Sequence, residues 1–250
     1  MPISYTFQQD ECPSFGGASL SKARIPVILK IEEYVRSLGD NNVTGIDIQR
    51  SIDHNENDTR SLISVMRKLN LINMQYPIEA SRFFTGNGKA YIHTLRALQS
   101  IQEGSEAYNL TIKALQLILQ DGIWYHYNTT DNTRLGIYII LNIIGKTNTL
   151  SFNEYCFALS ESNEGKYDFK RITNEILNNR DKHIEYSFKK KRRTNTKDAL
   201  GNYIIAEVDS FDTVLQSTRE FLQQAGILVD DTTDCELKDR NFLKKHNLPI

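Results

Sequence analysis

The sequence predicts a mainly α-helical protein with short β-hairpins, and three observations support this fold class. Apolar residues recur at helical spacing in several segments, capping residues and glycines mark the ends of those segments, and one order of elements occurs twice. The 250 residues, of which 40% are hydrophobic and 24% charged, suffice for one large domain or two small ones with a buried core. This composition excludes a disordered, collagen-like or coiled-coil chain.

Three helices are expected near the start of the chain. Apolar residues at positions i, i+3, i+4 and i+7 predict an amphipathic helix over residues 26–38, which Gly39 would end in a left-handed conformation. Thr44 is expected to cap a short second helix, and Asp58 a third one whose buried stripe ends at Leu69.

A hairpin and a fourth helix complete this first set of elements. Residues 81–85 are expected to be extended, residues 86–89 to form the turn of a wing, and residues 90–101 to form a helix. Three helices followed by a short hairpin are the outline of a winged helix-turn-helix. The sequence therefore predicts a first winged-helix subdomain over residues 1–107.

A linker is predicted over residues 108–133. It would begin with a helix as far as Leu119 and continue as a loop that holds three aromatic residues, Trp124, Tyr125 and Tyr127. Two interpretations of these aromatics stay open. They could stack on nucleic-acid bases, or they could anchor the linker against both subdomains, which is the commoner arrangement.

The same order of elements then recurs over residues 134–250. An apolar helix over 134–144 would end at Gly145, and Ser151 and Asp168 would cap a short second helix and a polar third helix. The remaining elements are a basic run, a closing helix over 210–224 that Gly226 stops, a short strand at 227–229 and a polar tail. The whole chain is thus predicted to be two tandem winged helix-turn-helix subdomains joined by a linker helix.

Charge is unevenly distributed along the chain. The net charge is −1, from 30 basic and 31 acidic residues, so a nucleic-acid-binding surface would have to be local. Five consecutive cations, Lys189 to Arg193, follow the second polar helix, and acidic residues gather near residue 230. Such a basic run suits contact with phosphates, which supplies affinity without sequence specificity; a solvated charge run is the alternative.

The third helix of each set carries the residue types that bond base edges in a major groove. The alternative is the solvated face that any amphipathic helix needs. With the residues that flank the first wing and with the basic run, the candidate DNA-binding residues are Arg60, Ser61, Ser64, Arg67, Lys68, Arg82, Lys89, Lys170, Arg171, Asn174, Asn178, Lys189, Lys190, Lys191, Arg192 and Arg193.

Catalytic and metal-binding patterns are poor. The five histidines are scattered, and Cys12, Cys156 and Cys235 are expected to be free thiols in a reducing cytoplasm. Asp231 and the run Glu236-Leu237-Lys238 match the letters of a metal-dependent nuclease site but lie too close together in a polar tail. We therefore expect no catalytic residue, metal site or cofactor, no small-molecule substrate, and neither a membrane span nor a secretion signal.

Four stretches of the sequence carry a resemblance to a known family. They are residues 25–30, residues 83–90, residues 135–175 and residues 212–229. In these stretches the chain resembles the N-terminal recognition region of type IIS restriction and nicking endonucleases of the AlwI group.

The resemblance implies a function and a partner. Winged-helix subdomains of these enzymes read a short asymmetric site in double-stranded DNA, and a Mg²⁺-dependent nuclease domain follows them. Because the chain ends at Ile250, about where a linker to that domain would begin, the cleavage domain is expected to be absent, and a nuclease domain or subunit could act in trans. Whether the protein is an enzyme is left open.

Three other functions remain as alternatives. The chain could be a tandem winged-helix replication initiator or transcription regulator, which would usually read a palindrome as a dimer. It could be a scaffold for protein interactions, which its net charge permits, or a nuclease by itself if the acidic tail formed a metal site.

Overall fold

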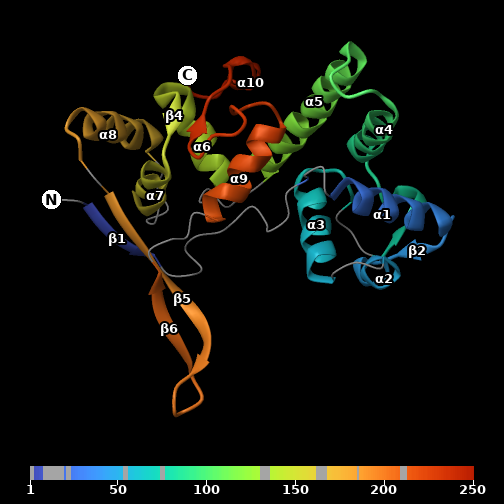
Figure 1. Ribbon diagram of the computed structural model, residues 1–250, viewed down its shortest axis with the longest axis horizontal. Helices are drawn as coiled ribbons and strands as arrows, with labels where there is room; N and C mark the ends of the chain where they lie inside the picture. The colour runs from blue at the N-terminus through green and yellow to red at the C-terminus, as the bar shows by residue number, and fades with distance from the viewer. Residues whose placement is uncertain are drawn as a thin grey trace. The chain divides into compact units, whose positions relative to one another are not determined.

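The computed structural model describes residues 3–7, 20, 24–52, 56–73, 77–129, 136–161, 168–184, 186–208 and 213–250. These residues form a mainly helical fold with a few short strand pairs, as the sequence predicts (Figure 1). The chain divides into two compact units. We call residues 16–130 with 220–227 the N-terminal unit, and residues 1–15, 131–219 and 228–250 the C-terminal unit.

The N-terminal unit packs its helices around an aliphatic core. Its elements are α1 (Ile25–Ser37), β2 (Asn42–Val43), α2 (Gly45–Ser51), α3 (Glu56–Lys68), β3 (Ile78–Glu79), the 3-10 turn η3 (Ala80–Arg82), α4 (Gly86–Ser100) and α5 (Glu106–Thr129). The β2 and β3 strands pair antiparallel, and Ile72 bridges Phe84 beside them. Buried side chains of α1 and α3, among them Ile28, Ile31 and Met66, fill the core.

The predicted ends of the first helices are largely confirmed. Gly39 follows α1 with a φ of 58°, the left-handed conformation that favours glycine. The Thr44 hydroxyl accepts the Asp47 N–H at 3.2 Å, and the Asp47 carboxylate accepts the Thr44 N–H at 2.9 Å, a complete capping box. The cap predicted at Asp58 is wrong, because α3 already begins at Glu56.

The predicted wing at residues 81–89 is also wrong. Residues 80–82 form a 3-10 turn, and α4 begins at Gly86 because the Thr85 hydroxyl accepts the Gly88 N–H at 3.0 Å and caps the helix. Gly88 is not a turn residue. A Cβ there would lie 1.8 Å from the Leu71 carbonyl oxygen, so glycine lets α4 approach the backbone that follows α3.

The linker loop predicted after Leu119 is helix instead. The α5 helix runs unbroken to Thr129, with a buried stripe at Leu119, Gly122, Ile123 and His126. These positions have the i, i+3, i+4, i+7 spacing of a helix, which the three neighbouring aromatics obscured. Within this helix Trp124 stacks on Tyr127, with ring centroids 5.3 Å apart. The end of the predicted linker, residues 130–133, lies outside the described residues.

The C-terminal unit surrounds one helix that is apolar on all sides. Its elements are β1 (Ile3–Phe7), α6 (Gly136–Thr147), β4 (Thr149–Leu150), α7 (Phe152–Glu161), α8 (Phe169–Asp181), β5 (Tyr186–Lys197), β6 (Tyr203–Val208), β7 (Cys235–Glu236) and α10 (Asn241–Lys245), and α9 (Thr213–Gln224) is divided between the two units. Nearly every described residue of α6 is buried, which is the property of a central helix.

Two of the helix starts in this unit are as predicted. Ser151 and Glu154 form a capping box at α7, and the Asp168 carboxylate accepts the Arg171 N–H at 3.0 Å at the start of α8. Gly226, with a φ of 68°, follows the end of α9 as predicted.

Gly145 does not end α6, which continues to Thr147. A Cβ at Gly145 would lie 2.0 Å from the Pro249 carbonyl oxygen, so this glycine admits the C-terminal segment, and Asn148 takes the left-handed position with a φ of 58°. The predicted polar tail is therefore folded. In it β7 pairs with β4, Leu228 bridges Leu237, and Phe242, Leu243 and Leu248 are buried.

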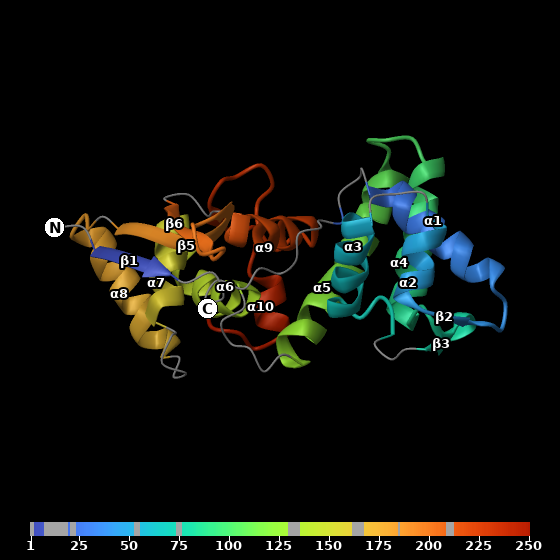
Figure 2. The same cartoon turned by 90° about the horizontal axis from the view of Figure 1, so that it is seen from below.

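The basic run lies in a long β-hairpin, which the sequence pattern does not predict. The β5 and β6 strands pair antiparallel, and β1 pairs with β5 in parallel, from Ile3 opposite Tyr186 to Phe7 opposite Lys190. The three strands lie side by side in Figure 2. Since β1 reaches only Lys190, it supports the base of the hairpin, and the distal part extends away from the helices of its own unit (Figure 1).

Three helices occur in the same order in both units, as the sequence predicts, and each set also has a short strand that was not predicted. The α1–β2–α2–α3 order of the N-terminal unit matches α6–β4–α7–α8, and both second helices begin with a capping box. Both third helices end two residues before a left-handed residue, Asn70 or His183.

Among the described residues, none of the helices combines the length and apolar character needed to cross a bilayer.

Candidate nucleic-acid interface

The β5–β6 hairpin concentrates positive charge. Its described residues, 186–208, hold six cations and two carboxylates, a net charge of +4. The whole chain has a net charge of −1, so the residues outside the hairpin sum to −5. The near-neutral net charge of the chain is therefore the sum of a basic hairpin and an acidic remainder. A polyanion would be attracted locally to the hairpin.

Side chains alternate along the hairpin and define two faces. In β5, Lys189, Lys191 and Arg193 share one face, and Lys191 and Arg193 lie opposite Glu207 and Ile205 of β6. The Lys189 ammonium lies 3.6 Å from the Glu207 carboxylate. Lys190 and Arg192 alternate with these residues along the strand; the positions of their side chains lie outside the described part of the structure.

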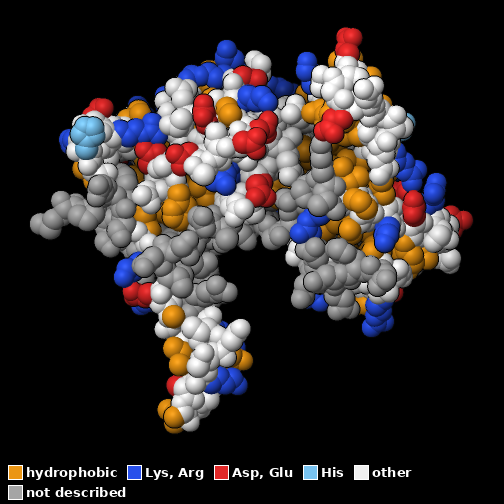
Figure 3. Space-filling model, viewed as in Figure 1, with side chains coloured by type: hydrophobic (Ala, Val, Ile, Leu, Met, Phe, Trp, Pro, Cys, Tyr) orange, Lys and Arg blue, Asp and Glu red, His pale blue; other side chains and the backbone are white. Residues whose placement is uncertain are grey.

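An aromatic residue joins the cations of this face. The Arg193 guanidinium carbon lies 3.4 Å from the centroid of the Tyr203 ring, and the Lys197 ammonium lies 4.9 Å from it. Such cation–π contacts hold the charges in place without neutralising them. Cationic and apolar side chains are therefore present together on the projecting hairpin, as Figure 3 shows.

A bulge and an ordered turn shape the distal hairpin. The register shifts between Arg193 and Lys197, and there the Thr194 hydroxyl contacts the Ile204 and Thr196 carbonyl oxygens at 3.0 and 3.2 Å. At the turn, one Asp198 carboxylate oxygen accepts the N–H groups of Leu200 and Asn202, each at 2.9 Å. Hydrogen bonding, above all from the Asn202 backbone, holds the pKa of Asp198 below its ordinary value.

The α8 helix presents polar side chains in one stripe. Lys170, Asn174 and Asn178 are four residues apart and exposed, as predicted for a third helix of this kind. Arg171 is exposed but ion-paired with Glu161 at 2.6 Å and Glu175 at 2.8 Å. The Glu161 hydrogen bond is the main cause of the raised pKa of Arg171.

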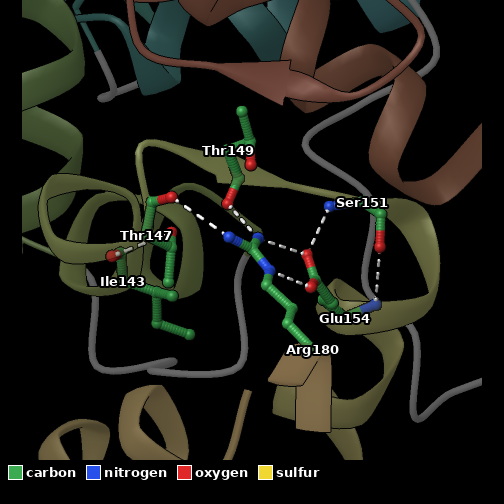
Figure 4. A network of polar contacts seen from close by, with 6 residues as sticks. All are labelled: Ile143, Thr147, Thr149, Ser151, Glu154 and Arg180. Carbon is green, nitrogen blue, oxygen red and sulfur yellow. Dashed lines mark hydrogen bonds and ion pairs between the residues drawn. The ribbon is translucent and has the colours of Figure 1, made fainter. Parts of the chain in front are cut away.

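Arg180 holds the C-terminal end of α8 in place. The helical period alone places this residue on the outer face of the helix, so the sequence does not indicate a structural role for it. Its guanidinium donates to both Glu154 carboxylate oxygens, at 2.5 and 2.8 Å, and to the Thr147 and Thr149 carbonyl oxygens, at 3.2 and 2.7 Å (Figure 4). The same carboxylate accepts the Ser151 N–H. The signal in the sequence was Glu154, a carboxylate three residues after the predicted cap residue Ser151.

The ionisation of Glu154 reflects this network. Burial by itself would raise the pKa of this carboxyl group, but the hydrogen bonds and charge of Arg180 and the Ser151 N–H outweigh burial, and the pKa lies below its ordinary value. Glu154 therefore stays charged and joins the α7 start to Arg180 at the α8 end. Arg180 in turn donates to the Thr149 carbonyl oxygen of β4.

The α3 candidates differ in accessibility. Arg60 and Ser64 are exposed, and Ser61 is half-buried. Arg67 is half-buried, with a guanidinium nitrogen 4.0 Å from where a Cβ at Gly45 would lie. Lys68 is also half-buried, and burial lowers its pKa. Arg67 and Lys68 are thus less open to a polyanion than the sequence implied.

The two candidates beside the predicted first wing are both exposed. Arg82 ends the 3-10 turn and lies 3.3 Å from the Glu79 carboxylate. Lys89 lies in the first turn of α4, at the rim of a cavity of about 270 Å³ that Phe84 and Arg96 also line. The candidates thus divide between the units: those of α3, Arg82 and Lys89 lie in the N-terminal unit, and those of α8 and the hairpin lie in the C-terminal unit.

The thiols and the acidic residues are described in part. Among the described residues, no three His, Cys, Asp or Glu side chains gather to hold a metal ion. Cys156 and Cys235 are buried and form no disulfide, and burial raises the pKa of Cys235 to about 12. Cys12 lies outside the described residues. Glu236 lies in β7 and pairs with Thr149 of β4, whereas a polar tail without a strand was expected there.

No known family, curated protein or solved structure matches this chain in comparisons of its sequence and fold.

Proposed function

We propose that the chain recognises a specific sequence in double-stranded DNA, as the recognition region of a type IIS restriction or nicking endonuclease does. The observation that carries the proposal is the segregation of charge, with +4 on one projecting hairpin and −5 on the rest of the chain. The C-terminal unit has both a basic β-ribbon and a helix, α8, with exposed Asn and Lys side chains. The ribbon suits phosphate contact and the helix suits base readout.

The order of elements supports a winged-helix arrangement of the C-terminal unit. In this proposal α6, α7 and α8 are its three helices, α8 enters the major groove, and β5 and β6 form the wing. One pairing departs from the usual pattern, because β4 pairs with β7 and not with the wing. In the N-terminal unit α1, α2 and α3 take the same roles without a comparable hairpin among the described residues.

A nuclease partner belongs to the proposal. Cleavage would require a Mg²⁺-dependent nuclease domain or subunit, and we assign no cleavage step to the described residues, in which no acidic cluster fits Mg²⁺. The DNA-binding residues act before that step and can be tested without it.

Selection from a randomised duplex library tests the proposed specificity. The purified chain is incubated with the library at about 50 and then at about 200 mM salt, where phosphate contacts weaken, and the retained DNA is sequenced. We expect a short asymmetric motif that survives the higher salt. A palindromic motif would instead indicate a regulator or initiator, and retention without any motif would refute sequence recognition.

The salt dependence of binding tests the role of the hairpin. A triple variant with alanine at Lys189, Lys191 and Arg193 should bind duplex DNA more weakly at all sequences. Its slope of log K against log salt should be smaller by about 3, since each phosphate that the protein neutralises adds roughly 0.9 to the slope. The matched control replaces three exposed lysines outside the hairpin, Lys30, Lys113 and Lys244, and should keep the slope. Equal slopes in both triple variants would refute the assignment.

A further inference from the structure

The tip of the hairpin exposes apolar side chains to an unusual degree. Nine large hydrophobic residues are exposed in the described part of the chain, and four of these lie within six residues of the hairpin: Leu200, Tyr203, Ile204 and Ile205. Leu200 is 86% exposed, the largest value of the nine. Single exposed apolar residues are ordinary, but a cluster on a projecting element indicates a surface that a partner covers.

Hydrogen bonds within the turn constrain the backbone of the tip. Besides the two N–H groups that the Asp198 carboxylate accepts, the Asp198 N–H donates to the Asn202 carbonyl at 2.8 Å and the Gly201 N–H donates to the Asp198 carbonyl at 3.0 Å. Gly201, with a φ of 85°, allows the chain to reverse there. Leu200 is thus presented on an ordered turn, so little conformational entropy is lost when a partner covers it.

Charge and size favour DNA as that partner. Cations of the hairpin lie on the strands behind the tip, so a polyanion that contacts them brings its bases toward Leu200. The minor groove of B-form DNA is only about 6 Å wide, so a two-stranded ribbon enters it where the groove is opened. Apolar side chains that insert between base steps open the groove and kink the duplex.

We propose that Leu200 is a wedge that inserts between two base pairs from the minor groove and bends the DNA. This inference rests on the proposed function, and it goes beyond that function by assigning a bending step to a residue that makes no charged contact. The cations of β5 hold the flanking phosphates, and the Asp198 turn keeps the leucine at the end of the ribbon.

Energy transfer between dyes at the two ends of a short duplex tests the wedge. The duplex carries the motif selected from the library, or a single fixed sequence if binding is without motif. We expect binding of the wild-type chain to shorten the end-to-end distance as a kink of about 20–90° would. Leu200→Ala should abolish most of this change and weaken binding about 5- to 20-fold, with an unchanged salt slope.

Matched variants separate the wedge from general effects. Leu200→Phe keeps an apolar wedge and should keep the bend, Leu200→Gln should lose it, and Leu110→Ala, at a 59%-exposed position of α5, should behave as wild type. If the wild-type chain binds DNA without bending it, or if Leu200→Ala bends DNA as wild type does, the wedge is refuted and DNA binding stands. If the chain binds no duplex, the proposed function fails as well.

Discussion

The Arg180 guanidinium group connects the C-terminal end of α8 to three other elements, α6, β4 and α7. The position of this end of the helix depends on these contacts. Replacing Arg180 with alanine leaves Glu154, whose side chain is only 10% exposed, without its charged partner. We expect the free energy of unfolding of the C-terminal unit to fall by about 2–3 kcal/mol, the range for a hydrogen-bonded and mostly buried ion pair. Urea denaturation followed by circular dichroism measures this change.

Arg171 supplies the matched control on the same helix. It also bonds two carboxylates, but it is exposed, so Arg171→Ala should cost at most about 1 kcal/mol. An equal loss in both variants would contradict the structural role of Arg180.

Because the pKa of Glu154 lies below its ordinary value, the stabilisation by this carboxylate is present above that value and is lost as the pH falls through the lowered pKa.

His126 is expected to make the N-terminal unit sensitive to acid. Burial first, and the charge of Lys68 second, lower its pKa from 6.5 to about 4. The unfolded chain takes up a proton near pH 6.5 and the folded chain does not, so the stabilisation is present above pH 6.5 and is lost progressively as the pH falls toward 4. We expect the free energy of unfolding to fall by about 2–3 kcal/mol over this range.

The pH dependence of the urea midpoint between about pH 7 and pH 4 measures this effect. His126→Gln should flatten the dependence, whereas His93→Gln, at an exposed position, should leave it as in wild type. A wild-type slope in His126→Gln would show that other groups cause the acid sensitivity.

Arg67 shows how a residue of the right type can be misread. It lies three residues before the left-handed Asn70, as Arg180 lies three before His183, and its guanidinium is near the start of α2. Its position in the helical period and its guanidinium group suit a contact with a base, but neighbouring residues half-bury the side chain. Asn174 is therefore the better position at which to test base readout.

At the scale of one element, the start of α4 offers a comparison of two glycines. Gly86 and Gly88 lie two residues apart in the first turn, but a Cβ at Gly88 would overlap the Leu71 carbonyl, whereas a Cβ at Gly86 meets nothing within 4 Å. Gly88→Ala should thus destabilise the N-terminal unit by about 3 kcal/mol, as overpacking against backbone does.

Gly86→Ala is the control and should leave stability unchanged or raise it by up to about 1 kcal/mol, because alanine favours the helix. Thermal unfolding of the two variants distinguishes the outcomes. Similar melting temperatures for both would mean that α4 does not need its close approach to Leu71.

The elements also show what local sequence patterns can predict. Caps at Thr44, Ser151 and Asp168 were predictable because each involves residues three apart. The role of Gly145 was not, because it depends on the Pro249 carbonyl, which is distant in sequence. The start of α4 also depends on residues three apart, Thr85 and Gly88, but the two glycines were interpreted as a turn. The basic run gave no strand signal, since its cations occupy both faces and mask the alternation of a hairpin.

At the scale of the whole molecule, the order of elements was predictable and the pairing of strands was not. The repeat of three helices follows from local spacing, but the strands β2 and β4 within it were not predicted. The pairs of β4 with β7 and of β1 with β5 join segments far apart in the chain. The candidate site has the same division. The exposed stripe of α8 follows from helix period, but the hairpin, the Tyr203 contacts and the exposed Leu200 required the fold.

The pairing of β1 with β5 has a consequence for synthesis. Ile3 emerges from the ribosome early, but its partner Tyr186 is about 180 residues away, which is roughly 10–40 s of translation. During this interval residues 16–130, the larger part of the N-terminal unit, can fold between the two strands, while β1 remains an unpaired edge. The base of the basic hairpin therefore depends on a strand that is made about 180 residues before its partner and has to stay available for pairing until then.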